Sequence, residues 1–395
     1  MSLYRRLLLL FLRIIMNFKF EKPVFILDAA KAVPMVDLPG AELTNRELSH
    51  LMAQVQFKLL QEKQPRHIEV SDVDFPYDRV GIRSRRILDQ LFGVKDLAAA
   101  ASHKVLAGRS DLGRLRAIIV STVTADKIVP SVASALQFEL RIQSSVQAFD
   151  LRIGCSGYAA ALEISARLLQ SYPPGSMVLT VGADCMSRVL DASDRGTCIL
   201  FGDGGGAVLL GTSPAEEDAD GLGAVYGEPW HMVSAESYTD GSRGDLIEIK
   251  DEDNQGKTIY RFVAHGRELA VEPDELSKMT VFMNGRAVYR DMVRLVPDKI
   301  REHLKNLDLS VGDVDLFLFH QANARMIEAI ASRLEIPDYK LHNNIENMGN
   351  TTNGCLPCLI ADEVRHNNTQ LRRAMVVAFG TGYGINLSCW ERSAK

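Results

Sequence analysis

A strand, a Gly-Cys-Ser-Gly turn and a helix are predicted in direct succession around residues 146–170, and this stretch constrains the fold most strongly. Its first part is alternating and β-branched, as in a strand, and residues 159–170 form an apolar, alanine-rich run typical of a helix. Cys155 lies in the turn, where free backbone N–H groups and the helix dipole favour an anion. This position predicts a lowered thiol pKa and a nucleophilic thiolate. A free cysteine is equally often a small buried hydrophobe, so Cys155 alone does not decide between a nucleophile and a structural residue.

The composition describes a large globular protein. The chain has 395 residues, of which 46% are hydrophobic and 24% charged, enough for one large core or for two domains that share one. A net charge of −5 and the lack of a long Lys/Arg run argue against nucleic-acid binding. Six cysteines in so long a chain do not suggest a disulfide framework and fit a reducing, cytoplasmic setting.

The first residues of the chain are unusual. Residues 1–16 contain an apolar run of only six residues before Arg13, too short to span a bilayer, and no small-residue cleavage site follows. As a helix, this segment would place Arg6 and Arg13 opposite an apolar face, so it could contact a membrane surface or a partner. The alternative is that translation begins at Met16. We treat residues 1–22 as an extension and expect membrane contact, if any, only through residues 1–16.

From residue 23 onwards, strand-like and helix-like segments alternate. The predicted strands are residues 24–27, 117–124, 177–182, 315–319 and 374–379, and the predicted helices are residues 130–140, 287–304 and 324–334. Residues 213–280 are polar and are expected to form an irregular excursion. Both halves present polar residues at strand ends, which predicts a duplicated α/β unit with a site where the halves meet. The halves would be residues 23–212 and 213–395.

Three short motifs invite other interpretations. The glycine run in residues 201–206 resembles a nucleotide loop, but strand-like apolar residues follow it, which favours tight turns or close packing. Cys355 and Cys358 form a CxxC motif without a second pair at zinc-site spacing, so we interpret it as structural and predict no metal site. The basic segment 80–87 is either a solvated face or, near a cleft, a phosphate contact.

Three side chains of types that enzymes use in catalysis lie at predicted strand and turn ends. Besides Cys155, His320 closes an apolar strand and Asn350 lies in a turn beside Gly349. Each has an ordinary explanation, since strand-end histidines are often plain hydrogen-bond donors and Asn-Gly pairs are common in turns. A thiol, an imidazole and a carboxamide together are harder to explain structurally, and they indicate a catalytic constellation.

These motifs resemble those of the β-ketoacyl-acyl-carrier-protein synthase III family of the thiolase-like superfamily, over about residues 24–390. The matching stretches are GIRSRR at 81–86, GCSGY at 154–158, DRGT at 194–197, FGDG at 201–204, MNGR at 283–286, HQAN at 320–323 and GNT at 349–351. The resemblance implies a thiolase-like α/β fold with duplicated halves in five layers (α/β/α/β/α), and a homodimer.

The resemblance also implies two-step chemistry. The Cys155 thiolate would attack an acyl-CoA, and the backbone N–H groups of Cys155 and Thr381 would stabilise the oxyanion. A malonyl thioester, expected to be malonyl-acyl carrier protein, would then lose CO₂. His320 and Asn350 would stabilise the resulting enolate, whose carbon attacks the acyl-cysteine. No metal or cofactor is implied beyond these substrates.

Further residues receive roles from the same resemblance. The residues expected to bind CoA are Phe75, Arg79, Arg195 and Arg286. Arg325 is expected to dock the acidic carrier protein, although solvated surface charge is the alternative for each arginine. Val129 stands before Pro130, where the family often has an aromatic residue that closes the partner subunit's acyl pocket. The smaller side chain predicts a longer or bulkier acyl group than acetyl.

Some features depart from the family. The terminal loop 380–386 reads GTGYGIN, where the family usually has more glycine and a tryptophan. A backbone N–H donor at Thr381 tolerates this change. The extension and residues 213–280 suggest a specialised pathway. The alternatives are acyl transfer to oxygen or nitrogen, a non-decarboxylating condensation of two acyl chains, or a catalytically silent partner subunit. Asn350 favours enolate stabilisation among them.

Overall fold

The computed structural model describes residues 20–62, 68–142, 145–213, 229–251, 258–274 and 279–392. The segment 1–16, a surface-lying or partner-docking helix in one of the two interpretations of the sequence, lies outside these ranges. Within them, every helix is too short or too polar to cross a membrane.

One mixed sheet of nine strands runs through the molecule in the order β13-β14-β15-β8-β1-β7-β6-β4-β5. The strands from the first half of the chain are β1 (Val24–Ala32), β4 (Leu115–Ser121), β5 (Gln147–Leu151), β6 (Met177–Cys185) and β7 (Asp203–Gly211). Those from the second half are β8 (His231–Tyr238), β13 (Leu316–Phe319), β14 (Arg373–Gly380) and β15 (Gly384–Glu391).

The two groups of strands repeat one pairing pattern. In the first, β1 is antiparallel to β7, β7 is antiparallel to β6, and β6 is parallel to β4. In the second, β8 is antiparallel to β15, β15 is antiparallel to β14, and β14 is parallel to β13. The predicted duplication of an α/β unit is therefore confirmed.

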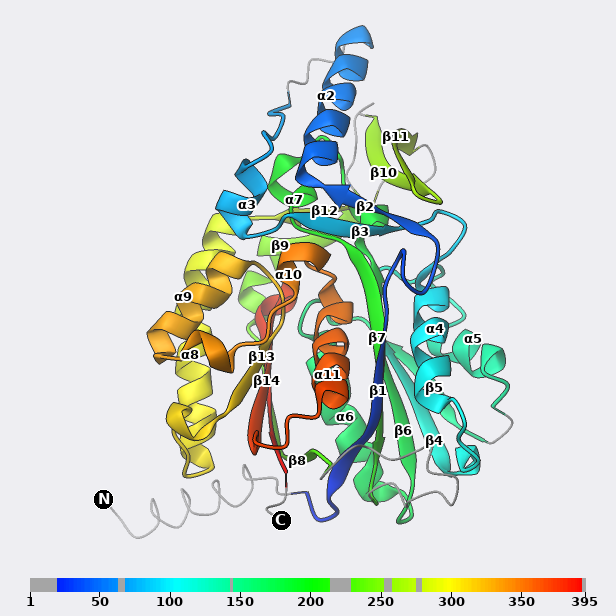
Figure 1. Ribbon diagram of the computed structural model, residues 1–395, viewed down its shortest axis with the longest axis vertical. Coiled ribbons are helices and arrows are strands. Elements are labelled where there is room, and N and C mark those ends of the chain that lie inside the picture. Colours follow the sequence, from blue (N-terminus) through cyan, green and yellow to red (C-terminus); the bar gives the residue numbers. More distant parts are fainter. Residues whose placement is uncertain are drawn as a thin grey trace.

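The helices complete a layered architecture (Figure 1). Helices α6 (Gly157–Ser171) and α11 (Cys355–His366) lie between the two groups of strands. Helices α4 (Val94–Leu106) and α5 (Val132–Glu139) cover the outer face of one group, and α8 (Gly285–Asn306) and α9 (Ala324–Leu334) cover the other. Small side chains let the central helices lie close to both groups of strands, and Ala159, Ala161 and Ala166 of α6 are buried.

The glycine run belongs to this packing. Its glycines 204–206 lie inside β7, as expected for strand packing and not for a nucleotide loop. A Cβ at Gly206 would lie 2.9 Å from the Cβ of Pro357 on α11, so glycine permits the close approach of helix and strand.

The prediction of an irregular region over residues 213–280 is wrong for the part that the structure describes. After β8 come β9 (Ile247–Asp251), a hairpin of β10 (Ile259–His265) with β11 (Glu268–Asp274), and β12 (Met279–Met283), which pairs with β9. The hairpin packs against α2 (Asn45–Gln61) and buries Tyr260 and Phe262. These four strands are only 5 to 7 residues long, too short for their apolar pattern to stand out among the polar residues around them.

Several shorter elements lie around the upper end of the sheet in Figure 1. They are β2 (Gly40–Thr44) paired with β3 (Ser84–Leu88), and the short helices α3 (Phe75–Val80), α7 (Arg195–Cys198) and α10 (Ile345–Met348). Thr44 and Glu47 form a capping box at the start of α2.

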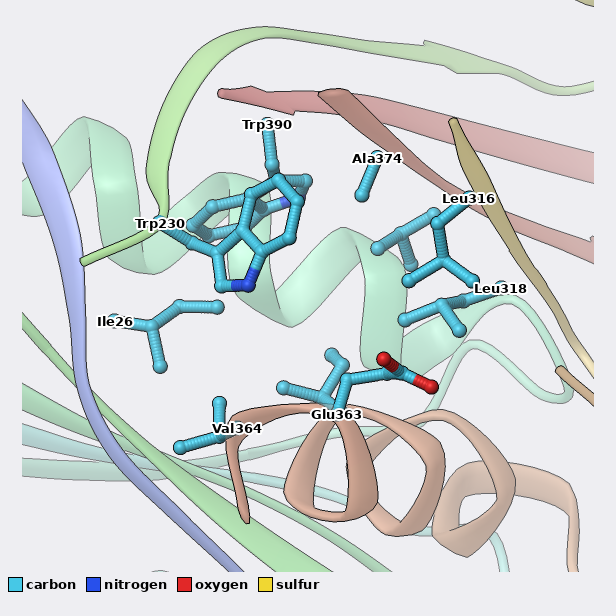
Figure 2. A pocket seen from close by; sticks show the side chains of 10 residues that line it. Ile26, Trp230, Leu316, Leu318, Glu363, Val364, Ala374 and Trp390 are labelled. Carbon is cyan, nitrogen blue, oxygen red and sulfur yellow. The ribbon is translucent and has the colours of Figure 1, made fainter. Parts of the chain in front are cut away.

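A small apolar void lies between α11 and the neighbouring strands (Figure 2). Its lining includes Trp230, Trp390, Leu316 and Leu318. With a volume of about 20 Å³, it has room for about one water molecule and is too small for an acyl chain.

Candidate active site

Cys155 follows β5 and precedes Ser156, the N-cap residue of α6. The loop at Thr381 lies directly against it, because glycines on both sides allow close contact. A Cβ at Gly380 would lie 2.7 Å from the Cys155 Cβ, and a Cβ at Gly154 would lie 2.4 Å from the Thr381 Cβ. Both glycines have positive φ angles, +151° and +105°. The Cys155 Sγ is 3.7 Å from the Thr381 Oγ1.

The electrostatics of Cys155 differ from the sequence-based prediction. Burial raises the pKa of the Cys155 thiol, and hydrogen bonds from the side chain and backbone of Thr381 lower it only in part. The predicted lowering of the thiol pKa is therefore wrong in direction, because desolvation of the sulfur outweighs the nearby N–H groups.

His320 follows the last residue of β13 and is buried. Its backbone N–H donates to the Val377 carbonyl at 2.7 Å, and its ring packs edge-on against Phe379 at 5.9 Å between centroids. Neither ring nitrogen has a hydrogen-bond partner among the described residues. Burial lowers the pKa of His320 to about 3, so the imidazole is neutral and presents one N–H donor.

Asn350 is held by its neighbours in a defined orientation. The Thr352 N–H donates to its Oδ1 at 2.8 Å, and its Nδ2 donates to the Ala322 carbonyl at 3.4 Å. The Gly202 N–H donates to the Asn350 carbonyl at 3.1 Å. Since an amide NH₂ group carries two hydrogens, one remains for a ligand.

A cavity of about 780 Å³ brings these groups together, and its lining includes Cys155, His320 and Asn350. The residues expected to bind CoA or the carrier protein also line it, namely Phe75, Arg79, Arg195, Arg286 and Arg325. Val129 is not among the lining residues. It lies in the loop between β4 and α5, where 79% of it is exposed.

Two of the cavity arginines already have partners. The Arg195 guanidinium stacks on the Phe75 ring at 4.1 Å from its centroid and forms an ion pair with Glu69. Arg325 pairs with Glu328 at 2.9 Å and donates to the backbone carbonyls of Tyr77 and Asp78. A flat ring beside a flat cation forms a platform suited to a nucleobase.

The basic segment 80–87 is solvated only at Arg83, and its arginines make no phosphate contact site in the cavity. Arg85 is fully buried and donates to the Ile199 carbonyl and the Asn45 Oδ1. Arg83 pairs with Glu346 and Arg86 with Glu42, and none of the three arginines lines the cavity. The segment therefore holds neighbouring loops in place.

Sequence reasoning missed Asp184, near the end of β6. Its buried carboxylate accepts hydrogen bonds from the loop after β4, through the side chains of Thr122 and Thr124 and the N–H groups of residues 123 and 124. It also accepts from Thr352 Oγ1 and from the backbone and side chain of Asn353, beside Asn350. Asp184 thus ties the Asn350 loop to the first half of the molecule. A carboxylate in an otherwise apolar strand was the available signal.

A thiol, a neutral imidazole and a carboxamide around one cavity, in a duplicated five-layered fold, define a condensing enzyme of the thiolase-like class. Residues 149–228 match the family model of 3-oxoacyl-[acyl-carrier-protein] synthase III, and residues 304–391 match its C-terminal model. The β-ketoacyl-[acyl-carrier-protein] synthase III of Porphyra purpurea is 35% identical over 331 residues, covering 82% of this chain and 92% of the relative. The chain belongs to the β-ketoacyl-[acyl-carrier-protein] synthase III family and is an acyltransferase.

Solved structures agree with this assignment. The 3-oxoacyl-[acyl-carrier-protein] synthase III of Aquifex aeolicus superposes with a TM-score of 0.72 at 26% identity, covering 93% of this chain and 99% of that one. A priming β-ketosynthase from a polyketide biosynthetic pathway superposes with a TM-score of 0.73 at 23% identity, covering 96% of this chain and 99% of that one. This second likeness concerns the fold alone.

Proposed function

We propose that the protein condenses an acyl group taken from acyl-CoA with a malonyl thioester carried by acyl carrier protein. The observation that carries this proposal is the single cavity lined by Cys155, His320 and Asn350, with arginines along the same lining. The family membership of the chain supports the same reaction class.

In the first step, the Cys155 sulfur attacks the thioester carbon of acyl-CoA. The carbonyl oxygen becomes an oxyanion, which the backbone N–H groups of Cys155 and Thr381 stabilise. The bond from carbon to the CoA sulfur then breaks, CoA leaves as a thiol with the proton that Cys155 has given up, and the acyl group stays on Cys155 as a new thioester.

In the second step, the malonyl thioester loses CO₂, and the electron pair of the broken C–C bond forms an enolate. His320 and Asn350 each donate one hydrogen bond to its oxygen. The enolate carbon attacks the acyl-cysteine, a C–C bond forms, and the Cys155 sulfur leaves. Every electron pair is accounted for within the two substrates, so we propose that no metal or cofactor takes part.

The CoA nucleotide is proposed to bind where Arg195 stacks on Phe75, with Arg79 and Arg286 near its phosphates. Arg325 is proposed to contact the acidic carrier protein, to which its charge is complementary.

Replacing Arg195 by alanine is expected to raise the KM for acyl-CoA about tenfold and to change kcat less than about twofold, because the lost contact is remote from the reacting carbon. Steady-state kinetics measure both values. With an acyl-pantetheine donor, which lacks the nucleotide, variant and wild type should have equal kcat/KM. Arg301→Ala, on the exposed face of α8, is the control. An unchanged KM for acyl-CoA would contradict the assignment of Arg195.

The protein is proposed to act as a homodimer. Strand β5 ends the sheet as an edge strand, and the apolar side chains of Ile128, Val129 and Phe138 are largely exposed nearby in the chain. An edge strand flanked by exposed apolar residues is suited to pairing with a second copy. In such a dimer, Val129 of one copy would close the acyl pocket of the other.

Replacing Val129 by phenylalanine is expected to reduce acylation by octanoyl-CoA relative to acetyl-CoA by about tenfold, since a ring fills the pocket that valine leaves open. Competition between the two donors, read as the mass of the Cys155 adduct, measures this ratio. Ile128→Phe, at the neighbouring exposed position, is the control. If acetyl-CoA outcompetes octanoyl-CoA on the wild-type protein, the interpretation of Val129 is wrong.

Radiolabelled CO₂ release from a malonyl thioester tests the proposed function against acyl transfer to another nucleophile and against a non-decarboxylating condensation. The proposal predicts CO₂ release in step with formation of a 3-oxoacyl product. Acyl transfer or condensation without CO₂ release would overturn it.

We also propose that the two halves divide near residue 212, between β7 and β8.

All six cysteines are free, which supports a reducing, cytoplasmic setting for the enzyme. The pathway is proposed to be fatty-acid or specialised lipid or polyketide biosynthesis.

A further inference from the structure

The loop Thr381–Tyr383, between β14 and β15, carries the backbone N–H group proposed to stabilise the oxyanion. Its conformation is unusual, because Gly382 and Tyr383 both lie in the left-handed region, with φ angles of +68° and +49°. A non-glycine residue in this region is strained and persists only where its surroundings hold it. Tyr383 is also buried, so the loop is anchored through this side chain.

The anchor is a carboxylate on α8. The Tyr383 hydroxyl donates to the Asp291 Oδ2 at 3.0 Å, and Arg243 Nη1 donates to the same oxygen at 2.5 Å. Arg290 Nε donates to the Asp291 Oδ1 at 3.1 Å. The Arg243 guanidinium also lies 5.8 Å from the centre of the Tyr383 ring.

Asp291 is ionised at neutral pH. Burial would raise the pKa of this carboxyl, but the hydrogen bonds from Arg290 and Tyr383 and the charge of Arg243 lower it overall. A buried carboxylate is a strong acceptor for the tyrosine hydroxyl. A further hydrogen bond, from the Asp240 N–H to the Tyr383 carbonyl at 3.4 Å, restrains the backbone of the loop.

The cluster of Tyr383, Asp291 and Arg243 lies outside the cavity. Cys155 and Gly380 line the cavity. Tyr383, Asp291 and Arg243 are not among the described residues that line it. Gly380 and Thr381 touch Cys155, so a shift of the loop would move the Thr381 N–H relative to the sulfur.

We propose that Tyr383 and Asp291 are positioning residues that hold the Thr381 N–H group at the oxyanion position beside Cys155. The inference rests on the proposed function and deepens it, because it assigns the accuracy of the acylation step to a hydrogen bond outside the cavity. Displacement of an oxyanion donor weakens only the stabilisation of the tetrahedral intermediate. Decarboxylation uses His320 and Asn350 and does not depend on this donor.

Tyr383→Phe removes the hydroxyl and keeps the ring. Loss of a whole oxyanion donor costs about 10²–10³ in rate, so a displaced donor is expected to slow acylation about tenfold. CO₂ release from a malonyl thioester by the pre-acylated variant is expected to stay within about twofold of wild type, because the donors to the enolate, His320 and Asn350, are unchanged. Mass spectrometry of the Cys155 adduct over time gives the first rate, and radiolabelled CO₂ gives the second.

Tyr260→Phe is the matched control, since it also removes a hydroxyl that a buried tyrosine donates to a carboxylate, Glu62, at 2.6 Å and outside the cavity. It should change neither rate. Arg243→Gln is a second variant for the case in which Tyr383→Phe does not fold, because the Arg243 side chain is 43% exposed. A smaller fall in acylation rate is expected, with CO₂ release unchanged.

Wild-type acylation rates in the folded variants would overturn this inference and leave the proposed function intact. An equal loss of both rates would also overturn it, since that pattern indicates a general structural role. Absence of any adduct on the wild-type protein would overturn the proposed function, and this inference with it.

Discussion

Replacing Cys155 by alanine is expected to abolish the acyl adduct and to reduce product formation by about 10⁴-fold or more, because the covalent step loses its nucleophile. Cys355 lies close to Asn350 but cannot substitute, since burial raises the pKa of its thiol to about 12. Intact-protein mass spectrometry after mixing with acyl-CoA, with a parallel assay of 3-oxoacyl product, measures both losses.

The control for this variant is Cys389→Ala, in which a buried thiol of β15 is removed. It should keep the adduct. An adduct of undiminished yield on Cys155→Ala would contradict the assignment of the nucleophile.

The raised pKa of Cys155 gives the same prediction a pH dependence. Below its pKa, the fraction of thiolate grows about tenfold for each pH unit, so the acylation rate of the free enzyme should rise steadily from pH 6 to pH 9. A rate that is constant over this range would indicate the lowered pKa that the sequence pattern suggests.

Replacing His320 by alanine is expected to slow CO₂ release from the malonyl thioester by about 10³-fold, because one of the two donors to the enolate oxygen is lost in a buried, desolvated site. Acylation of Cys155 should change less than about threefold, since that step uses the backbone donors. Separate measurements of CO₂ release and adduct formation give both numbers.

Between pH 5 and pH 9, the rate of decarboxylation by the wild-type protein should show no change caused by protonation of His320. Burial lowers the pKa of this group to about 3, so it stays neutral and keeps its N–H over the whole range. The control for the His320→Ala variant is His303→Ala, which removes another buried histidine, one that contacts Ser234 and Glu236. CO₂ release at the wild-type rate from His320→Ala would contradict the assigned role.

The sequence predicts the positions of chemistry-bearing residues well where a strand or helix is strongly patterned. Helix α9 has the predicted limits, Ala324–Leu334, because Asn323 caps it and its apolar side chains recur on one face. The strand before His320 is similarly clear, as its four residues are all buried. Such local signals depend little on the rest of the fold.

Properties that depend on contacts between residues far apart in the chain are harder to predict from the sequence. Burial beneath a loop 226 residues away raises the pKa of Cys155. The orientation of Asn350 depends on Thr352, which donates to it and is itself held by Asp184 on β6. The predicted strand 117–124 ends at Ser121 in the structure, where Thr122 and Thr124 turn to donate to Asp184. No local pattern in the sequence encodes these partners.

The central claim is that Cys155 carries the acyl group between two substrates. The most direct measurement is the mass of the Cys155-containing peptide after the wild-type protein is mixed with octanoyl-CoA, before and after a malonyl thioester is added. The account predicts one octanoyl group on Cys155, and its disappearance together with CO₂ release once the malonyl thioester is present. An unmodified peptide, or an acyl group that persists on Cys155 after CO₂ has been released, would contradict it.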